Sequence, residues 1–296
     1  MTAMPGRSHA GALPRLAPEG WALAERLRKH VVALASRERN ADLETPAHYI
    51  EQAFAGHGLA TQSQWFVSGG RKVRNVETAS GDALIVVGAH YDTVPGSPGA
   101  DDNASAVAAL IELAALLAPE RLPIRFVAFA NEEAPYFMGP EMGSFNSASR
   151  SRVNGERLRA MFSLEMLGYY RDTPGTQRYP ALFRLFYPDR ADFIAFVGDL
   201  GARSLVRRAV ASFRRNAAFP AEGVAAPAFI PGVTWSDHWS FRSQGFPAVM
   251  VTDTAFYRYP HYHLPSDTPE KLDYERMAHV TLGLAAMLRD LASNND

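Results

Sequence analysis

One histidine and three aspartates lie in a short loop between two apolar segments. In residues 85–105, IVVGAHYDTVPGSPGADDNAS, His90, Asp92, Asp101 and Asp102 separate an apolar β-rich run from an apolar helical run. Residues two apart on an extended segment point the same way, so Asp92 can accept a hydrogen bond from the His90 ring. This bond would aim the other ring nitrogen of His90 at a metal. Asp101 and Asp102 precede the helical run, where helix capping and the helix dipole account for the presence of one of them. The other is a candidate to bridge two cations.

Further acids and histidines follow other apolar runs. Glu132 and Glu133 come after IRFVAFAN, Glu165 interrupts MFSLEML, and His261 and His263 follow PAVMVTDTAFYRYP. Adjacent carboxylates after a buried strand repel each other unless a cation or a shared proton relieves them. One can then bind an ion while its neighbour acts as general base. A carboxylate inside a core run needs a partner, because burying it unpaired is costly.

Ligand-type residues at four strand ends together indicate a centre of two divalent cations. In open α/β sheets, ligands bind beyond the carboxyl ends of the strands. One His, a bridging Asp, two Glu and a second His match two zinc ions about 3.5 to 4 Å apart that share a water. The competing interpretations are exposed loop glutamates, a salt bridge at Glu165 and a histidine satisfied at a strand end. The sequence contains no cysteine, so any metal is held by N and O ligands.

The elements that must position these residues alternate between strand and helix. The runs ALIVVGA, IRFVAFA, MFSLEML and PAVMVTD are mostly separated by segments with helical spacing. This pattern predicts an α/β fold with a buried, mainly parallel sheet and helices on both faces. Helices are also expected over residues 19–36 and 45–58, followed by a hairpin with the turn SGGRK. A last helix, capped by Asp267 or Thr268 with Pro269 in its first turn, is expected to continue through Leu291.

Length and composition fit one domain. The chain has 296 residues, of which 47% are hydrophobic, and it shows no internal repeat or clear linker. We therefore predict a flexible N-terminal tail over residues 1–18 and a single catalytic domain over residues 19–296. The 30 basic and 31 acidic residues nearly cancel, which argues against nucleic acid or an anionic membrane as a partner.

Nothing in the sequence indicates export or insertion into a membrane. The first residues contain no uninterrupted apolar core like that of a signal peptide. The longest apolar run, residues 106–118, is too short to span a bilayer and contains Glu112. A cytoplasmic protein is therefore expected.

Five blocks of the sequence resemble metallopeptidase family 28 in the family's order. This family comprises co-catalytic zinc exopeptidases of the aminopeptidase S type and is related to glutamate carboxypeptidase and glutaminyl cyclase. The blocks lie between Gly88 and Asp273 and read GAHYDTVPGSPGADDNASAVAALIELA, IRFVAFANEEAPYF, MFSLEMLG, SDHWSFRSQGFPAV and YHLPSDTPEKLD. The resemblance implies the three-layer zinc-exopeptidase fold, with a mainly parallel mixed sheet. It constrains residues 169–234 and the N-terminal region only loosely.

The resemblance also implies a ligand set for two Zn²⁺ ions per chain. Asp102 would bridge the ions, with His90 and Glu165 completing one site and Glu133 and His263 completing the other. The family's aminopeptidases usually carry Asp where this chain has Glu165. Because the side chain of Glu165 is longer than that of Asp, a divalent metal other than zinc could take the place of zinc at this site.

The same resemblance implies catalytic roles. Glu132 would be the general base and Asp92 the partner that orients His90, while Asp101 would keep a loop or capping role. His261 and His238 would be pocket-lining or structural. The segment after the paired glutamates, APYFMGPEMGSF, is longer than in simple aminopeptidases and is expected to wall the pocket.

The predicted function is hydrolysis of a terminal peptide bond, in an aminopeptidase acting on peptides or small amino-acyl substrates. A carboxypeptidase of the same fold is one alternative. Another is a glutaminyl-cyclase-like acyltransferase with a single zinc, against which the complete set of ligands for two metals argues. A non-catalytic binding module is a third, although such relatives typically lack ligands. No G-x-S-x-G stretch supports a serine hydrolase. The substrate side chain and the oligomeric state are left open.

Overall fold

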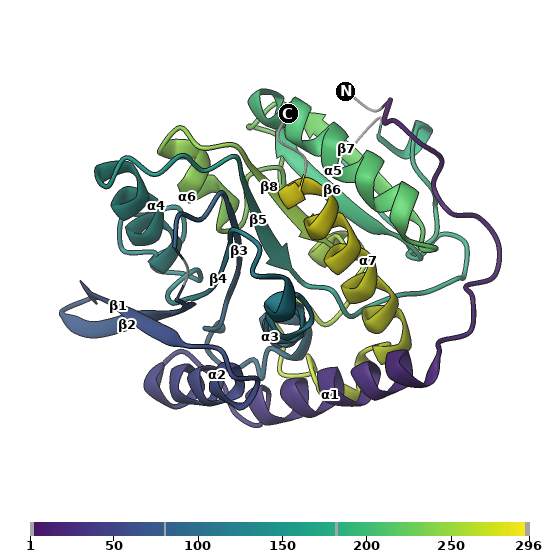
Figure 1. Ribbon diagram of the computed structural model, residues 1–296. Coiled ribbons are helices and arrows are strands. Elements are labelled where there is room, and N and C mark those ends of the chain that lie inside the picture. Colours follow the sequence, from purple (N-terminus) through teal and green to yellow (C-terminus); the bar gives the residue numbers. More distant parts are fainter. Residues whose placement is uncertain (1–2, 80, 181–182, 294–296) are drawn as a thin grey trace.

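A mixed eight-stranded sheet in the order β1-β2-β4-β3-β5-β8-β6-β7 forms the centre of the computed structural model, which describes residues 3–79, 81–180 and 183–293 (Figure 1). The neighbours β4, β3, β5 and β8 are parallel, β6 and β7 are parallel to each other, and the remaining pairs are antiparallel. The predicted mainly parallel, mixed sheet is therefore confirmed. The strands are β1 Thr61–Ser68, β2 Arg71–Thr78, β3 Ile85–His90, β4 Ile124–Phe129, β5 Ala160–Glu165, β6 Ile194–Asp199, β7 Ala221–Ala226 and β8 Ala248–Thr252.

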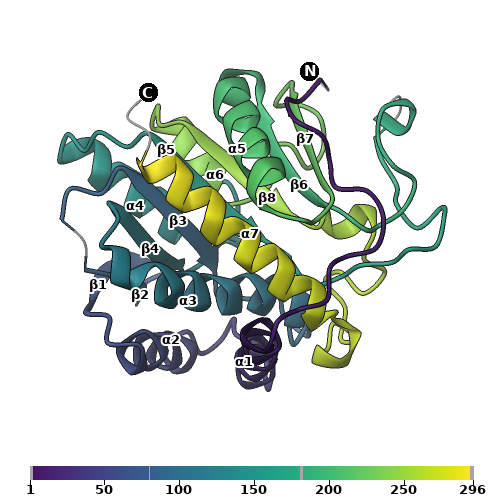
Figure 2. The same ribbon diagram turned by 45° about the vertical axis from the view of Figure 1, so that its right-hand side comes forward.

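Helices cover both faces of this sheet, which gives the predicted three layers (Figure 2). The helices α3, α5 and α7 pack on one face, with α1 and α2 beside α3, while α4 and α6 lie on the other face. Their bounds are α1 Pro18–Leu34, α2 Glu44–Gly56, α3 Ala106–Leu117, α4 Gly143–Val153, α5 Arg203–Asn216, α6 His238–Ser243 and α7 Tyr274–Ser293.

The apolar runs become strands because both of their faces are covered. Every residue of β3, β4, β5 and β8 is buried, as continuous hydrophobic runs in a parallel sheet require. The sheet core thus ends abruptly at polar residues, with His90 closing β3 and Glu165 closing β5.

Helix α3 is buried nearly all round. In the part of the chain that the structure describes, the helical stretch Ala100–Glu120 is the one long and apolar enough to cross a membrane. This stretch is longer than the apolar run seen in the sequence, but 78% of its most apolar window is buried inside the fold. That burial is typical of a core helix. A cytoplasmic location stays a prediction.

The last helix starts later than its sequence predicts. Helix α7 begins at Tyr274, and Pro269–Lys271 form a separate single turn. Asp273 caps α7, because its carboxylate accepts the backbone amide three residues on. Neither Asp267 nor Thr268 is therefore the cap. The carboxylate of Asp267 is instead used within the functional site.

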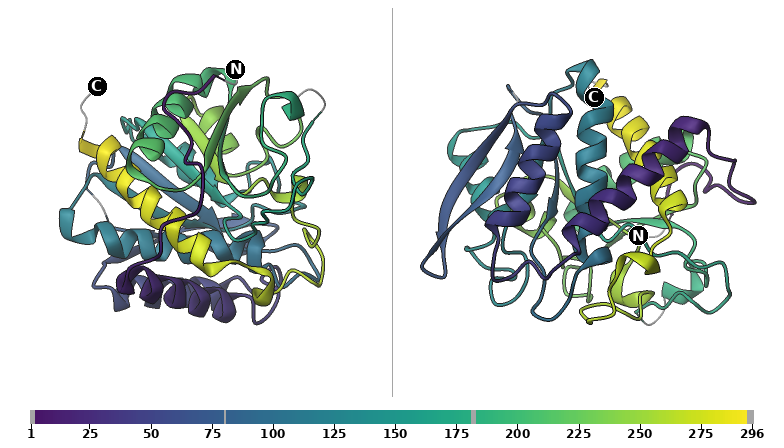
Figure 3. Two further views of the ribbon diagram at one scale, coloured as in Figure 1. Left: turned by 90° about the vertical axis from the view of Figure 1, so that its right-hand side faces the viewer. Right: turned by 90° about the horizontal axis from the view of Figure 1, so that it is seen from below.

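The segment before α1 runs along the outside of the domain toward α5 and β7 (Figure 3). Ser8 Oγ donates to the carbonyl of Ala221 at 3.1 Å and accepts its amide at 2.9 Å. Arg214 of α5 donates to the carbonyls of Pro5 and Gly6. The described part of the expected tail, residues 1–18, is thus anchored to the body of the protein. Its mobility, and a single domain over residues 19–296, stay predictions.

Candidate active site

Four parallel strands bring the predicted site residues to one edge of the sheet. His90 ends β3, Glu165 ends β5, Glu132 follows β4 by three residues, and His263 lies in the loop after β8. The first three are at most 7% exposed. These residues meet because the carboxyl ends of parallel neighbours face the same way.

Two histidines face opposite oxygens of a single aspartate. His90 Nε2 lies 3.3 Å from Asp102 Oδ1 and 3.6 Å from Glu165 Oε2. His263 Nε2 lies 3.1 Å from Asp102 Oδ2 and 3.3 Å from Glu133 Oε1. The structure thus brings all five predicted ligands together around Asp102. Which ion each residue binds stays a prediction.

The donor atoms of this cluster fit a cation. Buried atoms of two of its residues, Asp102 Oδ1 and His263 Nε2, make no well-directed hydrogen bond to any residue that the structure describes. Ligand atoms of His90, Asp102 and Glu133 lie within 4.8 Å of one another. Because buried polar atoms normally find partners, the unpaired Asp102 Oδ1 and His263 Nε2, which face the cluster, are atoms that a metal ion could satisfy.

The electrostatics of the site point the same way. Burial and the neighbouring Asp102 raise the pKa of Glu133 to about 7. Burial raises the pKa of Glu132 well above its ordinary value. His90 lowers this pKa in part, and the neighbouring Glu133 raises it further. Although burial lowers the pKa of His263, the carboxylates of Asp102 and Glu133 raise it to about 10. The site therefore concentrates more negative charge than its histidines balance, and cations would relieve it.

Asp92 holds the two glutamates as well as facing the histidine. Its Oδ1 accepts the amide of Glu132 and its Oδ2 accepts the amide of Glu133, both at 3.0 Å. Its Oδ1 lies 3.5 Å from His90 Nδ1, which is too long for a strong hydrogen bond. In this structure the stronger bonds of Asp92 thus fix the backbone of the general-base candidate.

Of the two roles predicted for Asp101, capping is wrong and a loop role fits its contacts. It is fully buried, and its Oδ1 accepts the amide of Gly168 at 2.9 Å, just beyond β5. Burial, followed by Asp253 and Asp267, raises the pKa of Asp101 well above its ordinary value. Asp267 in turn accepts the amides of Asp101 and Asp102 at 2.8 and 3.1 Å. These buried acids therefore shape the turn that presents Asp102.

The sequence reasoning assigned no role to two residues of the block SDHW. Among the described residues, neither carboxylate oxygen of the buried Asp237 has a well-directed hydrogen bond, and burial raises its pKa to about 7 against the influence of His90. Ser236 Oγ donates to Glu165 Oε2 at 2.7 Å. The block that contains them resembles the family in sequence, but only the fold shows that Ser236 and Asp237 lie at the site.

The two histidines not expected to be ligands have local partners. His238 is buried, and its Nε2 lies 2.9 Å from the carbonyl oxygen of Val233. His261 Nδ1 lies 2.9 Å from Ser266 Oγ. Both contacts fit structural roles.

Arg39 is a buried residue that the sequence reasoning also missed. Its Nε donates to the carbonyl of Tyr91 at 2.8 Å, its Nη1 to that of Pro98 at 2.7 Å and its Nη2 to that of Gly99 at 2.9 Å. Its backbone amide donates to Thr93 Oγ1 at 2.8 Å. One guanidinium thus fastens both ends of the loop between His90 and the Asp102 turn. A single arginine bound by carbonyls leaves no motif in a sequence.

An apolar pocket opens beside Glu165. In the part of the chain that the structure describes, no lysine or arginine lines it. Its larger aromatic and aliphatic lining residues include Tyr179, Phe183, Tyr187, Phe193, Val197, Val224, Ile230, Trp235, Met250, Phe256, Tyr257 and Tyr262.

The walls of this pocket correct a sequence-based prediction. Residues 134–145, which follow the paired glutamates, were expected to form the wall but are not among its lining residues. They turn back toward the sheet, since Gly143 N donates to Ala130 O at 2.7 Å. Phe137 of this segment makes an edge contact with the lining residue Trp235. The region of weakest resemblance, residues 169–234, supplies much of the wall instead.

The family model described as Peptidase family M28 matches residues 73–288 of the chain. The Escherichia coli (strain K12) protein named "Uncharacterized protein YfbL" is 40% identical over 285 residues, covering 89% of this chain and 87% of that protein. The "Probable leucine aminopeptidase" of Arthroderma benhamiae is 27% identical over 234 residues, covering 73% of this chain. The matched region spans 56% of the fungal protein.

Solved structures of the same fold include a zinc aminopeptidase and a glutaminyl cyclase. BSAP, a zinc aminopeptidase from Bacillus subtilis, matches with a TM-score of 0.68 at 16% identity, over 90% of this chain and 95% of that one. The glutaminyl cyclase of Bacteroides thetaiotaomicron matches with a TM-score of 0.67 at 15% identity, over 94% and 99%. At these identities the likeness concerns the fold.

Proposed function

Because the chain belongs to peptidase family M28 and is a metallopeptidase, we propose that it is a dinuclear zinc aminopeptidase, which removes N-terminal residues from peptides or small amino-acyl compounds. The observation that carries the proposal is the placement of His90 and His263 against opposite oxygens of Asp102. A carboxylate with a histidine on each side is suited to bridging two cations.

Five residues would hold the ions. His90, Asp102 and Glu165 would bind one, and Asp102, Glu133 and His263 the other. When bound, two zinc ions would lower the pKa of the attacking water and polarise the scissile carbonyl. The all-N/O donor set suits zinc. Metal analysis will show whether Glu165 admits another divalent metal.

The remaining steps belong to side chains of the chain itself. Glu132 accepts a proton from water at its carboxylate as the water oxygen bonds to the scissile carbonyl carbon. It then delivers that proton to the leaving amine nitrogen as the C–N bond breaks. Asp92 positions Glu132 through its backbone amide. Tyr262 stacks on His263 with ring centroids 3.8 Å apart and so supports the orientation of this ligand ring.

The pocket beside Glu165 favours an aminopeptidase over a carboxypeptidase. A carboxypeptidase must bind a free α-carboxylate, for which an arginine or lysine is the usual partner. The described pocket lining offers none, whereas Glu165 and Glu222 border it. Glu222 already pairs with Arg214 at 3.0 Å, which leaves Glu165 as the acid suited to an α-amine. The aromatic walls suit a bulky apolar first side chain.

The first test compares metal content and turnover. The double variant His90→Ala/His263→Ala should contain about two metals per chain fewer than the wild type, because each ion loses a histidine ligand. Glu132→Gln should keep the wild-type metal content but lose turnover at least ~10²-fold, since it removes only the general base. A loss of one metal in the double variant, or unchanged turnover in Glu132→Gln, would contradict the proposal.

A substrate panel tests the specificity. Leucyl and phenylalanyl amides should be hydrolysed, and N-acetylation should abolish their turnover by removing the α-amine. Peptides ending in a C-terminal acidic residue and peptides with N-terminal glutamine complete the panel. Cleavage from the carboxyl end of acetylated peptides would indicate a carboxypeptidase. Cyclisation of N-terminal glutamine without hydrolysis would indicate an acyltransferase.

A further inference from the structure

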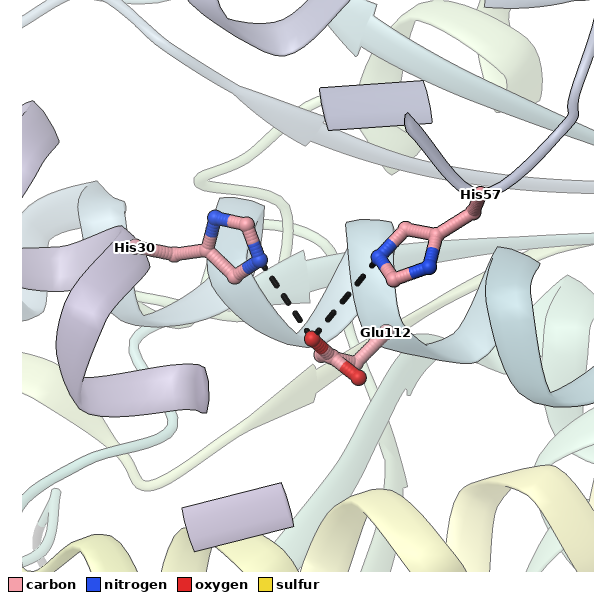
Figure 4. Close-up of side chains that lie close together, drawn as sticks. All are labelled: His30, His57 and Glu112. Atoms are coloured by element: carbon pink, nitrogen blue, oxygen red, sulfur yellow. Dashed lines mark ion pairs between the residues drawn. The ribbon is translucent and has the colours of Figure 1, made fainter. Parts of the chain in front are cut away.

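Ligand-type side chains also converge at a second place, outside the active site. His30 of α1, His57 directly after α2 and Glu112 of α3 point toward one another (Figure 4). His30 Nε2 lies 3.3 Å and His57 Nε2 4.0 Å from the same carboxylate oxygen, Glu112 Oε1. We propose that these three residues form a separate metal site that takes Zn²⁺ or a similar divalent transition-metal ion.

The spacing of the three ligand atoms suits a zinc ion. They all lie within 4.8 Å of one another. Two ligand atoms on a tetrahedral zinc lie roughly 3.3 Å apart, given metal–ligand distances of about 2.0–2.2 Å. The contact between His30 and Glu112 already has this length. His57 needs only a small shift, and its side chain is 30% exposed and free to make it.

The other ring nitrogen of His30 is held in place. His30 Nδ1 lies 2.8 Å from the hydroxyl oxygen of Tyr49, and the two rings meet edge to face. When Nδ1 donates this hydrogen bond, the lone pair of Nε2 points at the proposed site. Histidine ligands of metals usually have such an outer hydrogen bond, which fixes the tautomer and the ring orientation.

The carboxylate is held from outside as well. Arg26 Nε donates to Glu112 Oε2 at 2.9 Å and to Oε1 at 3.1 Å. The shorter bond goes to the oxygen that the histidines do not face. Arg26 would thus orient the ligating carboxylate in the way that outer partners of metal ligands do.

The position of Glu112 supports a purpose beyond one ion pair. Its side chain is fully buried in an otherwise apolar helix. Burying a carboxylate costs free energy unless a cation pairs with it, and Arg26 already provides that cation. The two additional imidazoles aimed at the same oxygen match the His₂Glu set found in zinc sites. The sides toward His57 and Arg26 are partly exposed, which leaves a path for the ion and a place for water.

The role expected of this ion is structural. It would join α1, α2 and α3, which lie side by side in the view from below (Figure 3). The N-terminal end of α3 continues directly from the turn that carries Asp102. An ion that fixes α3 would therefore stiffen the support of the active site without touching the substrate.

The test uses the full chain with both histidine ligands of the active site replaced. In the background His90→Ala/His263→Ala, metal-free protein is titrated with Zn²⁺ and, separately, with Co²⁺, whose absorption reports histidine coordination. About one Zn²⁺ per chain should bind and raise Tm by several degrees, since an ion that binds only the folded state stabilises it. The result does not depend on the proposed peptidase function, because both histidine ligands of that site have been replaced.

Variants within this background localise the ion. Adding His57→Ala should abolish binding, the Co²⁺ spectrum and the metal-induced rise in Tm. The matched control is His48→Ala, which removes an exposed histidine of α2 that lies 3.8 Å from Glu51. This control should keep all three signals. Because His57 is partly exposed, its variant should unfold at the same Tm as the background without metal. No binding in the background, or equal binding by the His57→Ala and His48→Ala variants, would overturn the proposal.

Discussion

Asp267 accepts the backbone amide of Asp102 at 3.1 Å, although 165 residues separate them in the chain. Its other oxygen accepts the amide of Asp101 at 2.8 Å and the hydroxyl of Tyr259 at 2.7 Å. The loop before α7 therefore fixes the backbone from which the proposed bridging ligand extends. The position of Asp102 thus depends on the loop before α7 as well as on its own loop after β3.

Asp267→Asn should weaken metal binding at the active site by about 10- to 100-fold, because an amide can accept only one of the two backbone bonds well. The affinity can be measured by competition with a chromophoric chelator, in the His57→Ala variant so that only this site reports. Glu270→Gln, which changes an exposed acid in the same loop, is the control and should bind metal like its parent. Equal affinities for the two variants would contradict the role of Asp267.

The strand framework of the site could be predicted from sequence because its signals are local. His90 and Glu165 each end a run of buried apolar residues, and a polar residue at such a point marks the edge of the sheet. Parallel pairing then brings the two together without further information. For this reason the predicted ligands converge in the structure.

The supports of the site could not be predicted because their partners are distant in the chain. Asp267 precedes Thr268-Pro269, a pattern that predicts a helix cap, and only the fold shows that its carboxylate serves another loop. Arg39 binds backbone carbonyls, which every residue possesses. Asp237 faces the site through the packing of α6, which no local spacing reveals.

Arg39→Lys should lower the free energy of unfolding by about 2–4 kcal/mol and reduce turnover. Lysine cannot reproduce the fork that reaches carbonyls at both ends of the loop, and the charge stays buried. Urea unfolding monitored by circular dichroism measures the first effect. Arg37→Lys, at an exposed position two residues earlier, should leave both quantities unchanged. If the free energy of unfolding of Arg39→Lys equals that of the Arg37→Lys control within error, Arg39 does not hold the two ends of the loop together.

The buried His238 should make the protein less stable in mild acid. Burial lowers its pKa from the ordinary 6.5 to about 4. Between these values the unfolded chain binds the proton and the folded chain does not, so stability is full above pH 6.5 and falls as the pH drops toward 4. The loss amounts to about 3 kcal/mol.

The measurement is urea unfolding at several pH values between 4 and 7. His238→Gln keeps a donor for the carbonyl of Val233 but cannot titrate, so its stability should depend less steeply on pH than that of the wild type. His48→Gln, at an exposed site, should follow the wild-type curve. Parallel curves for wild type and His238→Gln would show that another group causes the acid sensitivity.

The apolar pocket should determine which first residue is removed. Val224→Phe adds bulk to the wall, so kcat/KM for a phenylalanyl substrate should fall at least ~10-fold relative to an alanyl substrate, as a few methylene groups in a pocket change it. The metal content should not change, because Val224 is not among the proposed ligands. Val67→Phe, at a 70% exposed position in β1, is the matched control. If Val224→Phe lowers both substrates equally, the pocket does not hold the side chain, and the selectivity must come from the surfaces nearer Glu132.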